Sequence, residues 1–157
     1  MSERQVPHFA PDTQRHALYA WERDFVERYI GDEIMSRDGC ENLVRSASAF
    51  LGMRAPRIVY TKIEGMPCRA VPDTHSLEIA SWGRGHVTLL HEVAHLDTWP
   101  TVMRGEAAHG PTFLGCAMSL YARFLRIPVS HLERTARLRG LAFVPPLGPA
   151  LGLPPEV

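Results

Sequence analysis

The segment His91-Glu92-Val93-Ala94-His95 constrains the fold of this chain more than any other feature of the sequence. Residues four apart lie on the same face of an α-helix, so one helix would present both imidazoles together. Apolar residues recur at helical spacing around the segment and predict a buried helix: Val87, Leu90, Val93, Ala94 and Leu96. Trp99 before Pro100 predicts its end, and the helix is expected over residues 86–98.

The two imidazoles have the spacing that binds one zinc ion, and Glu92 can reach a water molecule on that ion. The competing interpretation is a pair of ordinary histidines on a core helix, bonded to neighbouring carbonyls. A catalytic zinc takes a third protein ligand and keeps one position open. Metzincins supply that ligand by continuing the motif with glycine and histidine, where this chain has Thr98 and Thr101.

His109 is the favoured third ligand because it directly precedes a predicted helix. Gly110 follows it, and Pro111 suits the first turn of a helix over 111–126. The apolar face of that helix predicts packing against the motif helix, which would carry His109 toward the metal: Phe113, Leu114, Ala117, Met118, Tyr121, Phe124 and Leu125. A loop histidine without a role, Glu106 as the ligand, and Cys116 as a soft ligand remain as alternatives.

His-Glu-x-x-His followed by His-Gly-Pro-x-Phe resembles the SprT-like (Spartan-type) zinc metalloprotease domains, over roughly residues 57 to 125. The run from Ser81 to Pro100 also resembles a small family of actinobacterial proteins described only as metallohydrolases. The resemblance implies one zinc ion held by His91, His95 and His109, with Glu92 as the catalytic acid and base. SprT-like domains often carry a cysteine-bearing zinc ribbon or DNA-binding extensions, and neither is visible in this sequence.

The remaining patterns predict an α+β fold: a single zincin-like domain over residues 1–143, with a small antiparallel or mixed sheet packed against helices. Helices are expected within 12–51, the first after a cap at Asp12 or Thr13 and the second from Asp38 to Gly52 with Glu41 as its capping-box partner. Strands are expected at 57–63, 69–71 and 75–80. A last helix over 130–139, capped by Ser130 and Glu133, precedes a proline-rich tail at 144–157 that lies on the surface or stays mobile.

Composition limits the partners. Lysine plus arginine equals aspartate plus glutamate at 17 each, so bulk charge argues against nucleic acid as an obligate partner. An arginine-rich stretch late in the chain is more typical of solvated helix faces than of a basic patch: Arg123, Arg126, Arg134, Arg137 and Arg139. The polar amino terminus, Met1 to Phe9, and the lack of any long apolar run indicate a cytoplasmic protein without a membrane span. Cys40, Cys68 and Cys116 are expected as free thiols.

The function that these residues favour is zinc-dependent hydrolysis of amide bonds in a peptide or protein substrate, with Glu92 moving the proton. A zinc hydrolase of another substrate, such as RNA, and a zinc-stabilised binding module without turnover are the alternatives. An extended peptide could pair with the strand that contains Leu77 and Ile79. Asp97, Glu78 and Glu106 are the nearest candidates in sequence to orient the imidazoles. Tyr60, Arg104 and Tyr121 are candidate oxyanion donors, each with a structural role as the stronger interpretation.

Overall fold

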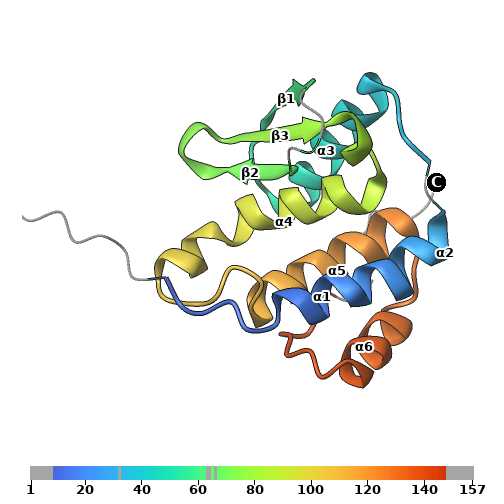
Figure 1. Ribbon diagram of the computed structural model, residues 1–157, viewed down its shortest axis with the longest axis vertical. Coiled ribbons are helices and arrows are strands. Elements are labelled where there is room, and N and C mark those ends of the chain that lie inside the picture. The colour runs from blue at the N-terminus through green and yellow to red at the C-terminus, as the bar shows by residue number, and fades with distance from the viewer. Residues whose placement is uncertain (1–8, 32, 63–64, 66, 148–157) are drawn as a thin grey trace, which may run out of the picture.

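The helix that carries the motif, α4 (His86–Met103), lies between a small sheet on one side and a layer of helices on the other (Figure 1). The computed structural model describes residues 9–31, 33–62, 65 and 67–147. It has an α+β architecture, as predicted, with α3 (Arg37–Leu51) and the sheet packed against α4 from above in Figure 1. α5 (Pro111–Leu125) packs along the opposite side of α4, and α6 (Val129–Leu138) packs against α5.

The first helix has three parts: α1 (Arg15–Trp21), a π-helical segment η1 (Glu22–Glu27) and α2 (Arg28–Ile30). Gly31 ends it at φ 82°, a conformation that glycine adopts without a Cβ clash. The predicted helix is confirmed, but its predicted cap is wrong. Gln14 occupies the N-cap position and makes no side-chain cap, because its amide binds the His109 and Ala142 backbone. The Asp12 carboxylate is bound to His109.

The N-cap of α3 lies two residues before the predicted cap. The Ser36 hydroxyl accepts a hydrogen bond from the Gly39 N–H at 3.1 Å, so Ser36 is the N-cap in place of Asp38 and the predicted capping box with Glu41 is wrong. The predicted end at Gly52 is confirmed, with φ 70° and backbone bonds back to the last turn. Apolar spacing located this helix, while two candidate caps so close together left its first residue ambiguous.

The sheet has strand order β1-β3-β2, formed by β1 (Arg57–Thr61), β2 (Arg69–Val71) and β3 (Ser76–Ala80). β1 and β3 run parallel, and β2 pairs antiparallel with β3, so the sheet is mixed. The strand that contains Leu77 and Ile79 is therefore central, with β1 on one side and β2 on the other. The hypothesis that a peptide pairs with that strand is disfavoured, because β1 already pairs with it along its length and β2 pairs with its first three residues.

α4 continues to Met103 with Pro100 inside it, and its predicted end before the proline is wrong. Proline removes one helical hydrogen bond and crowds the preceding turn. The Pro100 ring is exposed, while Thr98 and Val102 on either side of it are buried, so packing of the inward face holds the helix beyond the proline. The last helix also starts differently from the prediction: Pro128 occupies its N-cap position, and the Ser130–Glu133 capping box does not form.

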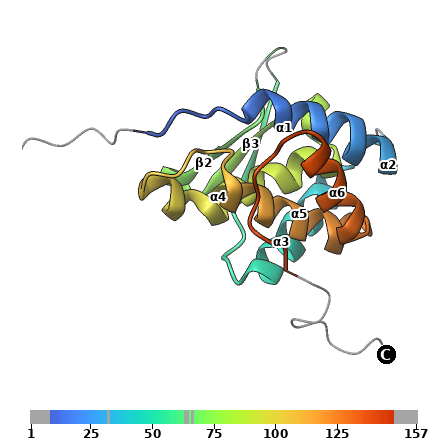
Figure 2. The ribbon, with the colours of Figure 1, turned by 90° about the horizontal axis from the view of Figure 1, so that it is seen from below.

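Seen from below, α1, α5 and α6 make up the face opposite the sheet (Figure 2). The large side chains buried between the layers include Leu18, Trp21, Leu77, Leu90, Phe113, Leu120 and Tyr121. The described start of the tail packs on α5, where the Val144 N–H donates to the Pro111 carbonyl and the Leu147 N–H donates to the Ser119 hydroxyl. Residues 148–157 of the tail and 1–8 of the amino terminus lie outside the described residues.

Two predictions about the surface also have an outcome. The five late arginines are all exposed, and Arg137 and Arg139 pair with Glu133 and Asp24. This is the solvated-face interpretation. Among the residues that the structure describes, no helix combines the length and apolarity needed to cross a membrane.

Candidate metal centre

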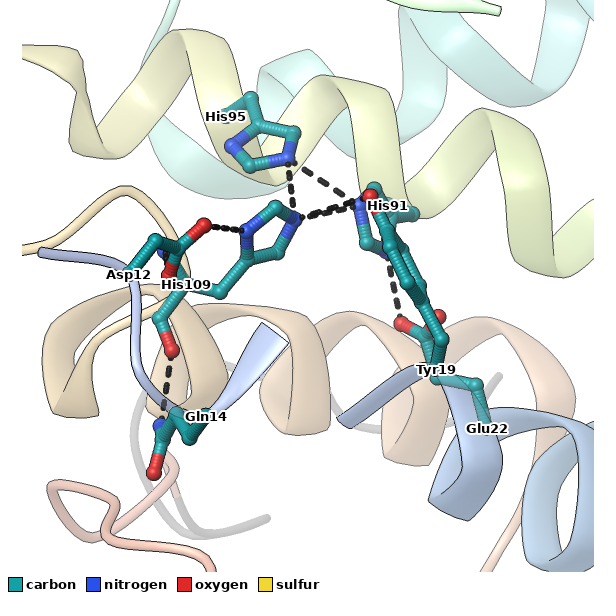
Figure 3. A network of polar contacts seen from close by, with 7 residues as sticks. All are labelled: Asp12, Gln14, Tyr19, Glu22, His91, His95 and His109. Carbon is teal, nitrogen blue, oxygen red and sulfur yellow. Dashed lines mark hydrogen bonds and ion pairs between the residues drawn. The ribbon is translucent and has the colours of Figure 1, made fainter. Parts of the chain in front are cut away.

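His91, His95 and His109 bring three ring nitrogens to one point in the interior of the protein (Figure 3). Their Nε2 atoms are 3.0 Å apart between His91 and His95, 3.1 Å between His95 and His109, and 3.3 Å between His109 and His91. Nitrogen ligands at the usual 2.0–2.1 Å from a tetrahedral zinc ion lie about 3.3 Å apart. The three histidines could therefore hold one metal ion, as the sequence predicted.

Local structure explains how His109 reaches His95, which lies fourteen positions earlier in the chain. His109 ends the loop between α4 and α5, and Pro111 opens α5 with its fixed φ. Gly110 fits between them because a Cβ there would come within 2.9 Å of the Ala107 carbonyl oxygen and of the Glu106 side chain. The Gln14 side chain donates to the His109 carbonyl at 2.7 Å and ties the loop to the start of α1.

Carboxylates bind the outer nitrogens of two of the three rings. The Nδ1 atom of His91 lies 2.7 Å from Glu22, and the Nδ1 atom of His109 lies 2.6 Å from Asp12. Asp12 also accepts from the His109 backbone N–H at 3.1 Å. A neutral imidazole has one N–H, and a carboxylate holds that hydrogen on Nδ1. The Nε2 lone pairs of His91 and His109 then face the common centre, which is the arrangement that a cation stabilises.

None of the carboxylates predicted to orient the imidazoles does so. Glu78 pairs with Arg69, and the half-buried Asp97 accepts from the Cys116 thiol at 3.5 Å. Glu106 accepts from the backbone N–H and the hydroxyl of Thr112, so it caps α5 rather than binding at the centre. Proximity in sequence selected these three residues, but the partners come from the start of the chain, 69 and 97 positions away.

The π-helical segment begins at the residue that supports the centre. Glu22 is its first residue, only 6% exposed, and its carboxylate accepts from His91 and from the Tyr121 hydroxyl, the latter at 2.6 Å. Trp21, just before the segment, is fixed by a bond from its indole N–H to the Thr135 hydroxyl at 2.9 Å. π-segments within helices occur often at functional sites. Nothing in the apolar spacing of 18–30 signalled this one, although an acidic residue on the apolar side of a predicted helix was a visible irregularity.

Glu92 lies beside the ring cluster and is buried, with 7% of its surface exposed. Burial raises the pKa of its carboxyl to about 7, against the opposing influences of nearby His91 and of a hydrogen bond from the Ala70 backbone, while the charge of Glu22 raises it further. Such a carboxyl exchanges its proton readily near neutral pH. Ala70 belongs to β2, the strand at the sheet edge next to α4.

Tyr19 is a site residue that sequence reasoning missed. Its ring stacks on His91, with centroids 5.6 Å apart, and its hydroxyl lies 3.3 Å from Nε2 of His109. The residue is 39% exposed, so the hydroxyl stands where the centre meets solvent. Burial raises the pKa of its phenol above the ordinary value, which keeps it a hydrogen-bond donor at neutral pH. Its position in α1 one turn before Glu22 was the available signal, but only the fold places α1 at this centre.

The predicted oxyanion donors are elsewhere or otherwise occupied. The Tyr121 hydroxyl donates to Glu22, and the Tyr60 hydroxyl donates to the Arg37 carbonyl at 3.2 Å. Arg104 bonds to Thr101 at the end of α4. Their structural roles were the stronger interpretation at the outset, and the contacts agree with it.

The surroundings set the protonation of the rings. Burial lowers the pKa of His95 well below its ordinary value, and burial likewise lowers that of His109 despite its bond to Asp12. At His91 burial also acts to lower the pKa, but the charge and hydrogen bond of Glu22 outweigh it and the pKa is raised. Phe113 contacts all three rings, with centroid distances of 4.3–5.1 Å, and forms the apolar wall of the centre.

The cysteines take no part in the ring cluster. Cys40, Cys68 and Cys116 are free, as expected, and Cys116 faces Asp97. Burial raises the pKa of the Cys116 thiol well above its ordinary value, which opposes a role as a thiolate ligand.

Comparison of the chain with protein-family models, with curated proteins and with solved structures finds no match in any of the three. The case for a metal centre therefore stands on the geometry of the three imidazoles and their carboxylates.

Proposed function

We propose that this protein is a zinc-dependent hydrolase of zincin type that cleaves amide bonds in a peptide or protein substrate. The convergence of three imidazole Nε2 atoms, two of them backed by carboxylates, carries the proposal. Three histidines with neutral lone pairs favour zinc over oxygen-seeking ions such as magnesium or calcium. Zinc bound there would polarise a carbonyl and acidify a water molecule at the fourth position.

Glu92 is the proton carrier in this proposal. With a pKa of about 7, its carboxyl can take a proton from the attacking water and return it to the departing amine nitrogen. The metal cluster consists of the three histidines and leaves Glu92 free for this role. Its burial keeps competing solvent away from the proton in transit.

Tyr19 is the donor that we assign to the developing oxyanion. Its hydroxyl lies at the open side of the ring cluster, 3.3 Å from Nε2 of His109, and stacking on His91 fixes its direction. A hydroxyl placed in advance stabilises charge as it forms on the carbonyl oxygen of the substrate.

The first test is the metal content of the protein purified without chelators. Zinc is expected at one ion per chain, lost in His109→Ala and kept in His16→Ala, which removes an exposed histidine of α1. Because the pKa of His91 is raised, zinc binding should release protons and weaken at acidic pH. Wild-type protein that binds no zinc even when zinc is supplied would rule out the proposal.

The second test is hydrolysis. Zinc-loaded protein is incubated with an unfolded protein, a mixture of peptides and RNA, and the products are analysed by mass spectrometry. Cleavage of peptide bonds by wild type but not by Glu92→Gln is the expected result. Cleavage of RNA alone would assign the centre to another substrate, and retention of zinc without turnover of any substrate would indicate a binding module.

A further inference from the structure

A second concave site lies at the edge of the sheet where the parallel strands β1 and β3 end. A cavity of about 280 Å³ is lined by Tyr60 and Thr61 at the end of β1, by Ile79 near the end of β3, and by residues that follow each strand. Ligands of mixed and parallel sheets bind preferentially at the carboxyl ends of the strands. None of the residues that line this cavity belongs to the histidine centre.

The cavity is cationic. Arg37, Lys62 and Arg84 line it, and none of the described lining residues is acidic. Within the described part of the chain, no carboxylate forms an ion pair with any of the three. Elsewhere the surface arginines Arg69 and Arg139 are paired with Glu78 and Asp24. Three cations around one cavity, none of them in an ion pair with a carboxylate of the described residues, attract an anion.

Two buried polar atoms at this cavity lack a hydrogen-bond partner. They are the Nε atom of Arg84 and the hydroxyl oxygen of Thr61, the only such side-chain atoms in the part of the chain that the structure describes. Leaving a buried donor unsatisfied costs about 1–3 kcal/mol, and more for a charged group. Both atoms belong to residues that line the cavity, and the described residues supply neither with a hydrogen-bond partner.

The arrangement of the cations suits an oxyanion. The Arg37 guanidinium lies 4.5 Å from the ring centroid of Tyr60, whose hydroxyl donates to the Arg37 carbonyl. The Arg84 carbonyl accepts from the Met35 N–H, which anchors its backbone to the start of α3. Two guanidinium groups and an ammonium offer donors to several oxygens at once, and a phosphate group presents more such oxygens than a carboxylate.

The geometry points to a binding site for a phosphate group, either free phosphate or the terminal phosphate of a small ester, separate from the metal centre and independent of its function. Arg84 and Thr61 bind the phosphate oxygens by hydrogen bonds, while Arg37 and Lys62 supply further positive charge.

The test is the effect of inorganic phosphate on the thermal unfolding midpoint and on calorimetric binding, with chloride at equal ionic strength as the reference. Phosphate should raise the midpoint of wild type. In Arg84→Gln its affinity should fall about tenfold to a hundredfold, the loss expected for one hydrogen bond to a charged group. Arg123→Gln removes the same charge from an exposed position on α5 and should bind phosphate like wild type.

Two further arms separate this site from the metal centre and from a purely structural role. In His95→Ala the response to phosphate should persist, whereas its loss would place the anion at the histidines and overturn the assignment. Without phosphate, Arg84→Gln should unfold no earlier than wild type, because it removes an unsatisfied buried donor.

The remaining outcomes identify the ligand. A nucleoside monophosphate that binds more tightly than inorganic phosphate would identify an ester as the source, and equal affinity would identify free phosphate. A wild type that responds to phosphate no more than to chloride, or more strongly to acetate than to phosphate, would overturn the proposal.

Discussion

The histidine centre and the cationic cavity differ in how their polar groups are partnered. At the centre, Glu22 and Asp12 bind the outer nitrogens of His91 and His109. At the cavity, the Arg84 guanidinium has a buried nitrogen without a partner. In the first region carboxylates hold the imidazoles in place from behind, and in the second the cations form no ion pair with any carboxylate among the described residues. A protein can thus prepare a site either by orienting ligands or by withholding a counter-ion.

The largest effect is expected at Glu92, because we propose that hydrolysis takes place at the histidine centre and not at the cationic cavity. Glu92→Gln should lower peptide hydrolysis by about 10²–10⁴-fold, because the amide cannot carry the proton, while zinc content is unchanged. Asp97→Asn, one to two turns along the same helix, is the control and should stay active. An active Glu92→Gln protein would remove the proton carrier from the proposed mechanism.

Tyr19→Phe comes next. Loss of the hydroxyl should reduce turnover by about 10²-fold through the missing oxyanion donor, with zinc retained. The matched variant is Tyr29→Phe in α2, where the hydroxyl of an exposed tyrosine is removed away from the rings. If Tyr19→Phe lost its zinc instead, the hydroxyl would be a metal ligand rather than an oxyanion donor. The proposed site of three histidine ligands with an open fourth position would then be wrong.

The support behind the rings is tested by Glu22→Gln. We expect zinc affinity to fall about 10- to 100-fold, measured by competition with a chromogenic chelator, since the amide no longer increases the basicity of His91. Asp24→Asn lies in the same π-helical segment but faces Arg23 and Arg139 at the surface, so it should leave affinity unchanged. Equal affinity in Glu22→Gln and wild type would show that carboxylate support is not what distinguishes the two regions.

The smallest effect concerns a cation that does have its partner. The hydrogen bond from Arg69 lowers the pKa of Glu78, so the stabilisation that their pair contributes is present above the unfolded-state pKa of about 4.3 and is lost as pH falls through the lower folded value. Glu78→Gln should cost less than about 1 kcal/mol of unfolding free energy at neutral pH, because the pair is at the surface.

Urea unfolding at neutral pH and well below about pH 4 measures this difference, which should vanish in acid. Glu41→Gln, exposed on α3, is the control. A difference that persisted in acid would mean that Glu78 stabilises the fold through packing. The Arg69–Glu78 pair would then no longer be an example of a cation stabilised by its counter-charge.

Much of the fold was predictable because the buried face of a helix or strand requires apolar residues at a regular spacing in the sequence. The spacing around Val87 and Leu90 located α4, and the β-branched run from Arg57 located β1. Helix ends were less predictable: Ser36 displaced Asp38 as a cap, and α4 continued through Pro100. Such ends depend on small energies that tertiary packing overrides.

The site divides in the same way. The spacing of His91 and His95 follows from helical geometry, and His109 followed from the helix it precedes. The partners of these rings were missed, since Asp97 and Glu106 were nearer in sequence than Asp12 or Glu22.

By itself the sequence determined the α+β character, the approximate positions of the helices and strands, and the shared face of His91 and His95, because each depends on contacts within a few residues or on one helical repeat. Only the tertiary structure decided that the first helix runs across the rings, bringing Glu22 and Tyr19 to them, and that β3 is the central strand. It also decided that Arg37, Lys62 and Arg84 surround one cavity. These groups meet through packing between distant segments, and such packing leaves no periodic signal along the chain.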